Sequence, residues 1–177
     1  MTKIISLVNQ KGGVGKTTTS INLAASLGKL GKKTLIIDLD PQGNTTTGLG
    51  VNKGEIKASI YDVLNGDSTI KKAIKKTSFD LLSIIPATIN LAGIDYELLE
   101  KGHNDSEFKK NEQLRNALSE VKDNYDYIII DCPPSLGVLT TNALVASDSV
   151  IIPVQCEFFA LEGISQLLNT IIMTQTR

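Results

Sequence analysis

A glycine-rich segment near the N-terminus holds the residue types that bind phosphate groups. It follows a strand-sized apolar run, Ile4 to Val8, and precedes a helical pattern. Glycines let successive backbone N–H groups point at phosphate oxygens, and the first turn of a helix adds partial positive charge. At this spacing the Lys16 amine would contact the β- and γ-phosphates, and the Thr17 hydroxyl would bind Mg²⁺. The segment predicted to bind a nucleoside triphosphate is Lys11, Gly12, Gly13, Val14, Gly15, Lys16, Thr17 and Thr18.

Acidic residues follow two further apolar runs. Asp131 comes after Tyr127 to Ile130, where a buried strand would hold its carboxylate rigidly enough to bind Mg²⁺ directly or through water. Asp38 lies at the end of another run and is expected beside the same ion, because ligands bind where parallel strands end. The segment Asp40 to Asn44 also has the composition of a surface turn, and both interpretations stay open on these residues alone. The predicted metal site is therefore Thr17, Asp131 and Asp38.

These residues need a scaffold in which strands and helices alternate. A helix over Thr17 to Leu30 and a second strand over Thr34 to Leu39 complete one βαβ unit. Further strands are predicted over Phe79 to Ile85, Tyr127 to Ile130 and Val150 to Val154. Further helices are predicted over Ser59 to Leu64, Ile89 to Leu99, Glu107 to Val121, Leu139 to Ala146 and Leu161 to Met173. The alternation predicts a three-layer α/β fold, with a mainly parallel sheet and helices on both faces.

Composition limits the class of protein. The chain has 177 residues, 41% of them hydrophobic, which is enough for the core of one compact domain. The 18 basic and 19 acidic residues give a net charge of -1, which excludes a disordered chain and a uniformly basic nucleic-acid binder. No apolar run approaches the ~20 residues of a membrane span. The N-terminus lacks the pattern of a secretory signal, so we expect a cytoplasmic protein.

One departure from the ordinary phosphate-loop pattern is informative. The pattern asks for glycine at the position of Gln10, and Lys11 stands beside it. In this the segment resembles the deviant Walker A motif of the ParA/MinD family of ATPases, in which a signature lysine precedes two glycines. Further stretches resemble the ParA/Soj branch of that family, namely Asn9-Gln10, Asp38 to Asn44, Asp131 to Gly137 and Pro153 to Gly163.

The resemblance implies an ATP-driven switch. In the family two subunits sandwich two ATP molecules, and the signature lysine of each reaches the phosphates held by the other. By resemblance, Lys11 would neutralise charge on the transferred phosphoryl group, as an arginine finger does, and Asp40 would orient the attacking water. The resemblance thus implies a homodimer on ATP binding, ATP and Mg²⁺ as cofactors, and Lys11, Lys16 and Asp40 as catalytic residues.

The resemblance also implies macromolecular partners. Members of the family bind DNA without sequence preference and act with a ParB-type protein in chromosome or plasmid segregation, so we expect a nucleoid-associated protein and no membrane contact. Such DNA binding rests on phosphate contacts. Six lysines against three acidic residues give the segment Lys53 to Lys76 a net charge of +3. Lys71-Lys72 and Lys75-Lys76 at helical spacing are nevertheless typical of a solvated helix face.

The C-terminal end of the sequence differs from an ordinary domain boundary. A helical pattern runs to Thr176 and Arg177 with neither a capping glycine nor a following strand. No linker rich in proline, glycine or serine divides the chain. We therefore expect residues 1–177 to form a single P-loop ATPase domain that lacks its C-terminal part. The resemblance implies that much of the DNA-binding surface would lie in that part.

Two alternatives remain open. A membrane-surface protein like MinD needs a C-terminal amphipathic helix, which a shortened sequence would not show. An electron-transfer reductase resembling the nitrogenase iron protein would use cysteines such as Cys132 to hold an iron-sulfur cluster between subunits. Such a cluster takes four thiolates. Cys132 also fits a small apolar residue packed behind the loop that follows Asp131.

Overall fold

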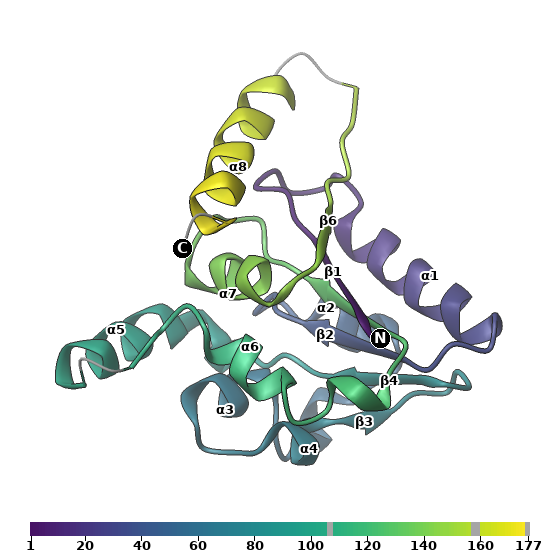
Figure 1. Ribbon diagram of the computed structural model, residues 1–177. Coiled ribbons are helices and arrows are strands. Elements are labelled where there is room, and N and C mark those ends of the chain that lie inside the picture. Colours follow the sequence, from purple (N-terminus) through teal and green to yellow (C-terminus); the bar gives the residue numbers. More distant parts are fainter. Residues whose placement is uncertain (106–107, 157–159, 176–177) are drawn as a thin grey trace.

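The protein is built around a mixed, mostly parallel β-sheet (Figure 1). The computed structural model describes residues 1–105, 108–156 and 160–175. Among these residues the sheet has six strands in the order β3-β4-β2-β5-β1-β6. The short edge strand β3 is antiparallel to β4, and the other neighbours pair in parallel. The strands are β1 (Lys3–Leu7), β2 (Thr34–Asp38), β3 (Lys75–Lys76), β4 (Leu82–Ile85), β5 (Tyr127–Asp131) and β6 (Ser149–Ile151).

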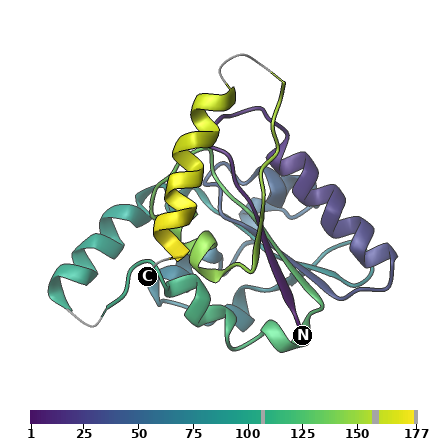
Figure 2. The same ribbon diagram turned by 45° about the horizontal axis from the view of Figure 1, so that its top comes forward.

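Helices cover both faces of the sheet, which gives three layers (Figure 2). One face carries α1 (Lys16–Lys29), and the short helix α2 (Asn44–Gly48) lies beside it. The opposite face carries α3 (Ile60–Asn65), α5 (Ile94–Asn104), α6 (Gln113–Leu118), α7 (Val138–Ala146) and α8 (Ala160–Gln175). The short helix α4 (Ile70–Ala73) and 3₁₀ turns at Lys53–Glu55, Ile89–Gly93 and Lys122–Asn124 complete the described elements. No helix of the described residues is long and apolar enough to cross a membrane.

The strands are apolar on both sides because both sides are buried. In β5, Ile128 and Ile130 pack in the core beneath α3, α5, α6 and α7, whereas Ile129 packs with Ala24 of α1 on the other face. Parallel strands covered by helices read as continuous rather than alternating apolar runs. The predicted three-layer α/β fold is therefore confirmed.

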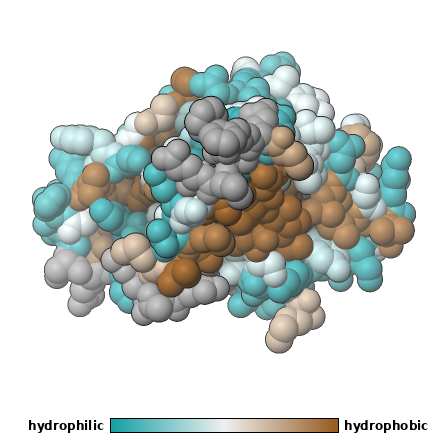
Figure 3. Space-filling view, turned by 90° about the horizontal axis from the view of Figure 1, so that it is seen from above, coloured by the Kyte–Doolittle hydropathy of each residue, from teal (hydrophilic) through white to brown (hydrophobic). Residues whose placement is uncertain are grey.

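Apolar side chains also reach the surface near the end of the sheet formed by β6. Seen from above, the molecule shows a continuous apolar area (Figure 3). In the segment after β6 and on α8, the exposed large apolar side chains include Val154, Leu168 and Ile172. The apolar character of the core thus continues to the surface at this end of the molecule.

Several predicted elements differ in extent from the observed ones. The helix predicted over Ile89 to Leu99 begins as a 3₁₀ turn and continues as α5 to Asn104. The strand predicted from Phe79 begins only at Leu82, because Leu81 has a positive φ of 60° that breaks the extended backbone.

The paired lysines do not share one helix face. Lys71 and Lys72 belong to α4, whereas Lys75 and Lys76 form the edge strand β3. The predicted helical spacing across all four is therefore wrong. Lysines on a short edge strand discourage pairing with other chains, which is a structural reason for Lys75 and Lys76.

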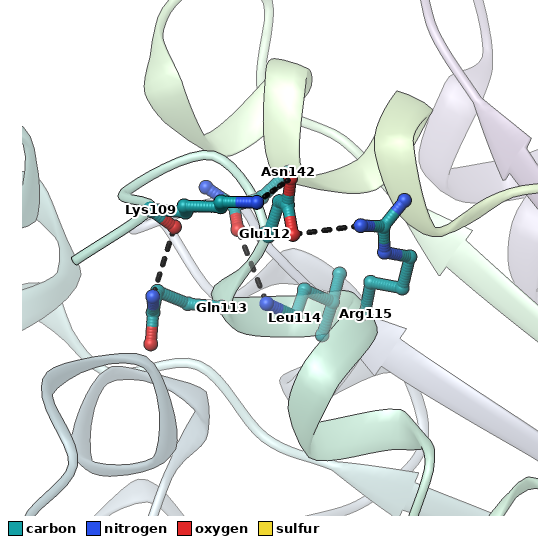
Figure 4. Close-up of polar contacts among 6 residues, drawn as sticks. All are labelled: Lys109, Glu112, Gln113, Leu114, Arg115 and Asn142. Atoms are coloured by element: carbon teal, nitrogen blue, oxygen red, sulfur yellow. Dashed lines mark hydrogen bonds and ion pairs between the residues drawn. The ribbon is translucent and has the colours of Figure 1, made fainter. Parts of the chain in front are cut away.

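The helix predicted over Glu107 to Val121 is wrong in extent, because α6 spans only Gln113–Leu118. Residue 107 lies outside the described residues. Before α6 the chain is held by Asn142 of α7, a buried side chain (Figure 4). Its Oδ1 accepts the Leu114 N–H at 3.1 Å, and its Nδ2 donates to the Lys110 carbonyl at 2.8 Å. Asn142 thus supplies from another helix the hydrogen bonds that a longer α6 would have made internally.

We expect Asn142→Ala to lower the free energy of unfolding by about 2 to 3 kcal/mol, because it leaves the Leu114 N–H and the Lys110 carbonyl without this partner. The matched control is Arg115→Ala, which removes the exposed ion pair with Glu112 at 2.7 Å in the same cluster (Figure 4). Arg115→Ala should lower the free energy of unfolding by less than about 1 kcal/mol. Urea unfolding of the three proteins measures both effects, and equal losses would contradict the anchoring role of Asn142.

Candidate functional site

The predicted site residues meet where β1, β2 and β5 end. In the sheet register Asp131 lies beside Leu7 of β1 on one side and beside Asp38 of β2 on the other. The chain leaves β1 at this edge, passes through the glycine-rich loop and enters α1 at Lys16. The two acidic segments and the glycine-rich loop therefore share one edge of the sheet, as the sequence predicts.

The glycines of the phosphate loop border open space. Gly13 and Gly15 have positive φ values of 76° and 88°, which residues with a side chain rarely adopt. A Cβ atom added at Gly12, Gly13 or Gly15 would meet nothing within 4 Å. Gly15 precedes α1 without a capping side chain, and the first turn of α1 holds no acidic residue. The first N–H groups of α1 and the partial positive charge at its N-terminus are thus suited to bind an anion.

Lys16 lies under the loop with only 7% of its surface exposed. Its Nζ donates to the Lys11 carbonyl at 3.0 Å. Burial lowers the pKa of the amine, and the negative charges of Asp131 and Asp40 partly oppose that effect. A buried ammonium group of this kind gains strongly from an anionic ligand, because little water is present to solvate it.

Asp131 is held by hydroxyl groups from three directions. Its Oδ2 accepts from Thr17 Oγ1 at 2.9 Å and from Thr45 Oγ1 at 2.6 Å. Its Oδ1 accepts from Ser20 Oγ at 3.0 Å. Burial raises the pKa of this carboxyl, and the three hydroxyls oppose the rise. Sequence reasoning missed Ser20 and Thr45, and the only signal for Thr45 was its place in the threonine run after Gly43.

Asp38 organises the segment that follows β2. It is fully buried, and its Oδ2 accepts both the N–H of Thr46 at 2.8 Å and the Thr46 hydroxyl at 2.7 Å. Its Oδ1 accepts the N–H of Asp40 at 3.1 Å. The Asp40 carboxylate is half-buried and accepts the N–H of Gln42 at 2.9 Å. The segment therefore contains a turn, and that turn is tied to the buried end of β2.

The donor set at this edge suits Mg²⁺. The Thr17 hydroxyl and the Asp131 carboxylate are hard oxygen ligands that already lie within hydrogen-bonding distance. Two buried carboxylates, Asp38 and Asp131, end neighbouring strands, and each would gain from a cation. Among the described residues no group of three or more His, Cys, Asp or Glu side chains could hold a metal ion. Mg²⁺ usually takes one or two protein ligands and completes its shell with phosphates and water. The Thr17 hydroxyl and the Asp131 carboxylate are therefore compatible with a Mg²⁺ site that contains no such cluster.

The two cysteines lie in different surroundings. Cys132 is buried in the core next to Asp131, and burial raises the pKa of its thiol. Cys156 is exposed in the segment after β6. The position of Cys132 is that of a small apolar residue packed behind the end of β5.

Comparison with known proteins identifies the family. The AAA domain family model matches residues 2–177. The sporulation initiation inhibitor protein Soj of Bacillus subtilis is 56% identical over 175 residues, which are 99% of this chain and 67% of that protein. The chromosome partitioning protein ParA of Myxococcus xanthus is 52% identical over 169 residues, which are 96% of this chain and 58% of that protein. The chain belongs to the ParA/Soj family.

Solved structures of other proteins share the fold over nearly the whole chain. Cobyrinic acid a,c-diamide synthase from Mycobacterium smegmatis, with bound ADP and magnesium, is 41% identical with a TM-score of 0.91, over 99% of this chain and 69% of that one. A putative plasmid partition protein from Borrelia burgdorferi bound to AMPPNP is 34% identical with a TM-score of 0.82, over 100% of this chain and 71% of that one. This ParA/Soj chain thus spans about two thirds of the proteins that it matches.

Asp38 makes the stability of this ParA/Soj chain depend on pH. Burial raises its pKa to about 6, although hydrogen bonds from Thr46 oppose the rise. The folded chain therefore holds this proton more tightly than the unfolded chain, whose Asp pKa is about 3.9. The contribution of Asp38 to the free energy of unfolding is therefore present at low pH and is lost as pH rises through about 6.

We expect the wild type to lose about 1 kcal/mol of unfolding free energy relative to Asp38→Asn between about pH 5 and pH 7. Urea unfolding at both pH values, in buffer without divalent cations, measures the difference. A wild type that gained stability relative to Asp38→Asn over that range would contradict the raised pKa.

Proposed function

We propose that this chain holds the ATPase site of a ParA/Soj-type partitioning switch that hydrolyses ATP to ADP and phosphate with Mg²⁺. One observation carries the proposal: Lys16, Thr17 and Asp131 converge under an open glycine loop at the end of the parallel sheet. Matched proteins crystallised with ADP and magnesium, or with AMPPNP, support ATP and Mg²⁺ as the ligands.

Each predicted residue then has a defined task. Backbone N–H groups from Gly12 to Thr18 surround the phosphates, and Lys16 exchanges its bond to the Lys11 carbonyl for phosphate oxygens. The Thr17 hydroxyl and the Asp131 carboxylate would hold Mg²⁺, with Asp38 next to Asp131. Mg²⁺ held there would neutralise negative charge on the phosphate groups.

The hydrolysis step needs a positioned water and a further positive charge. Asp40 would orient the water that attacks the γ-phosphorus while the bond to the bridging oxygen of ADP breaks. Its negative charge raises the pKa of the Lys16 amine, which supports a place for Asp40 close to the proposed phosphate site. Lys11 of a second subunit would stabilise the charge that develops on the transferred group. ATP binding would thus bring two copies of the chain together.

The biological role follows from the relatives. Chromosome partitioning and plasmid partition proteins are among the matched proteins, which supports a role in DNA segregation. We infer an ATP-dependent dimer that binds DNA without sequence preference, acts with a ParB-type protein and lies in the cytoplasm on the nucleoid. DNA affinity should fall steeply as salt increases, because phosphate contacts release bound cations.

Phosphate release with Mg-ATP tests the proposed activity. We expect Asp40→Asn to lower turnover by about 100-fold, because the amide no longer accepts a proton from the oriented water. ATP affinity should stay within about threefold, because the proposed role of Asp40 is to orient the attacking water and not to bind the phosphates. Asp67→Asn is a matched control on the exposed surface. Full turnover by Asp40→Asn, or equal loss in both variants, would refute the role of Asp40.

A further inference from the structure

Asn9 joins the phosphate loop to the segment after β6. It lies two residues after Leu7, the last residue of β1, and is buried, with 6% of its surface exposed. Its Oδ1 accepts the N–H of Lys11 at 2.9 Å, and its Nδ2 donates to the Pro153 carbonyl at 2.8 Å. Both ends of one buried carboxamide are thus used, and they connect main-chain groups far apart in the sequence.

The Lys11 main chain is held on both sides as a result. Asn9 binds its N–H group, and Lys16 Nζ binds its carbonyl at 3.0 Å. If Lys16 turned to a phosphate, its bond to the Lys11 carbonyl would be lost, whereas the Asn9 bond does not involve Lys16. Asn9 is then a side chain that continues to hold the peptide from which the Lys11 side chain leaves the loop.

The hydrogen bond from Asn9 to the Pro153 carbonyl connects the Lys11 peptide to the segment after β6. Pro153 follows β6, which pairs with β1 along the sheet. Two residues further on, Gln155 Nε2 donates to the Gly13 carbonyl at 3.1 Å. The loop is therefore braced against the end of β6 at two places, and the Asn9 side chain is the buried one of the two braces.

We propose that Asn9 is a positioning residue that acts through Lys11. By holding the Lys11 peptide it aims the lysine side chain at the phosphates of the opposite subunit. The consequence for hydrolysis rests on the proposed function, whereas the hold on the Lys11 peptide does not. Misplacing a charged group by about 1 Å can cost 100-fold in rate, so a hold of this kind matters for turnover.

Amide hydrogen exchange of Lys11 in the nucleotide-free protein tests the hold, with NMR resolving that single N–H. We expect Asn9→Ala to speed its exchange by about tenfold or more, because the amide loses its acceptor. Asn9→Ser should give an intermediate rate, because a serine hydroxyl accepts from the same N–H more weakly. Asn22→Ala is the matched control, because Asn22 is exposed on α1 and donates to the Thr18 carbonyl, away from the Lys11 peptide. Unchanged exchange in Asn9→Ala would overturn the proposal.

A double-mutant cycle tests whether Asn9 acts through Lys11. We expect Asn9→Ala to lower kcat by about tenfold with KM for ATP within about threefold, and Asn9→Ser to recover part of the loss. Combined with Lys11→Ala, Asn9→Ala should cause no further loss, because the side chain that it positions is already gone. Losses that multiply would assign Asn9 a structural role and overturn the proposal. If instead Lys16→Ala binds ATP normally, the proposed function fails while the exchange result still stands.

Discussion

Lys16→Ala is expected to weaken ATP binding by about 100-fold or more. The amine is buried beneath the loop, and its place in the motif is that of the lysine that contacts the β- and γ-phosphates. A hydrogen bond to a charged partner contributes about 1.5 to 3 kcal/mol, and the low local water content raises the value here. Alanine also leaves the Lys11 carbonyl without the Lys16 bond, so the loop itself should loosen. Titration with a fluorescent ATP analogue in the presence of Mg²⁺ measures the loss.

The control for Lys16→Ala is Lys29→Ala, at the other end of the same helix, where the side chain is exposed. Lys29→Ala should keep wild-type affinity, since the effect depends on the position of the charge and not on net charge. Thermal unfolding of both variants would show that the fold persists. A folded Lys16→Ala protein with wild-type affinity would remove the basis of the proposed function.

Sequence reasoning succeeded where one local rule determines the structure. The runs that form β1, β2 and β5 are apolar on both faces, so their patterns predict buried parallel strands without knowledge of any partner. The glycine loop likewise depends on local backbone freedom, at Gly13 and Gly15 above all. Asp131 could be placed from the end of its strand, because the carboxyl ends of parallel strands share an edge.

Sequence reasoning failed where distant residues decide the structure. The helix α2 is a short run of threonines with low helix propensity, and it gives no periodic signal. It is stabilised by Asp38, which accepts the N–H and the hydroxyl of Thr46, and it brings the Thr45 hydroxyl to Asp131. The shortened α6 depends in the same way on Asn142. Such contacts exist only after the elements have packed, so no window of sequence reveals them.

Lys11→Ala is expected to leave ATP affinity within about threefold and to lower turnover by about 1,000-fold. The Lys11 peptide belongs to the loop, and its carbonyl and N–H remain in place when the side chain is shortened. The lost amine would act only on charge that develops during transfer, so it should affect the rate and not ground-state binding. Single-turnover phosphate release, together with the affinity measurement, separates the two effects. Unchanged turnover would count against any catalytic role of Lys11.

A mixture of two inactive variants decides whether Lys11 acts on its own subunit or on the opposite one. A Lys11→Ala subunit retains Asp40 and an intact phosphate loop, whereas an Asp40→Asn subunit retains Lys11. If Lys11 acts across the dimer, the mixed dimer contains one complete site, so an equimolar mixture should recover about one quarter of wild-type turnover. If Lys11 serves its own subunit, both sites of the mixed dimer stay incomplete and no activity returns. Because neither variant is active alone, recovery could arise only from a lysine supplied by the opposite subunit.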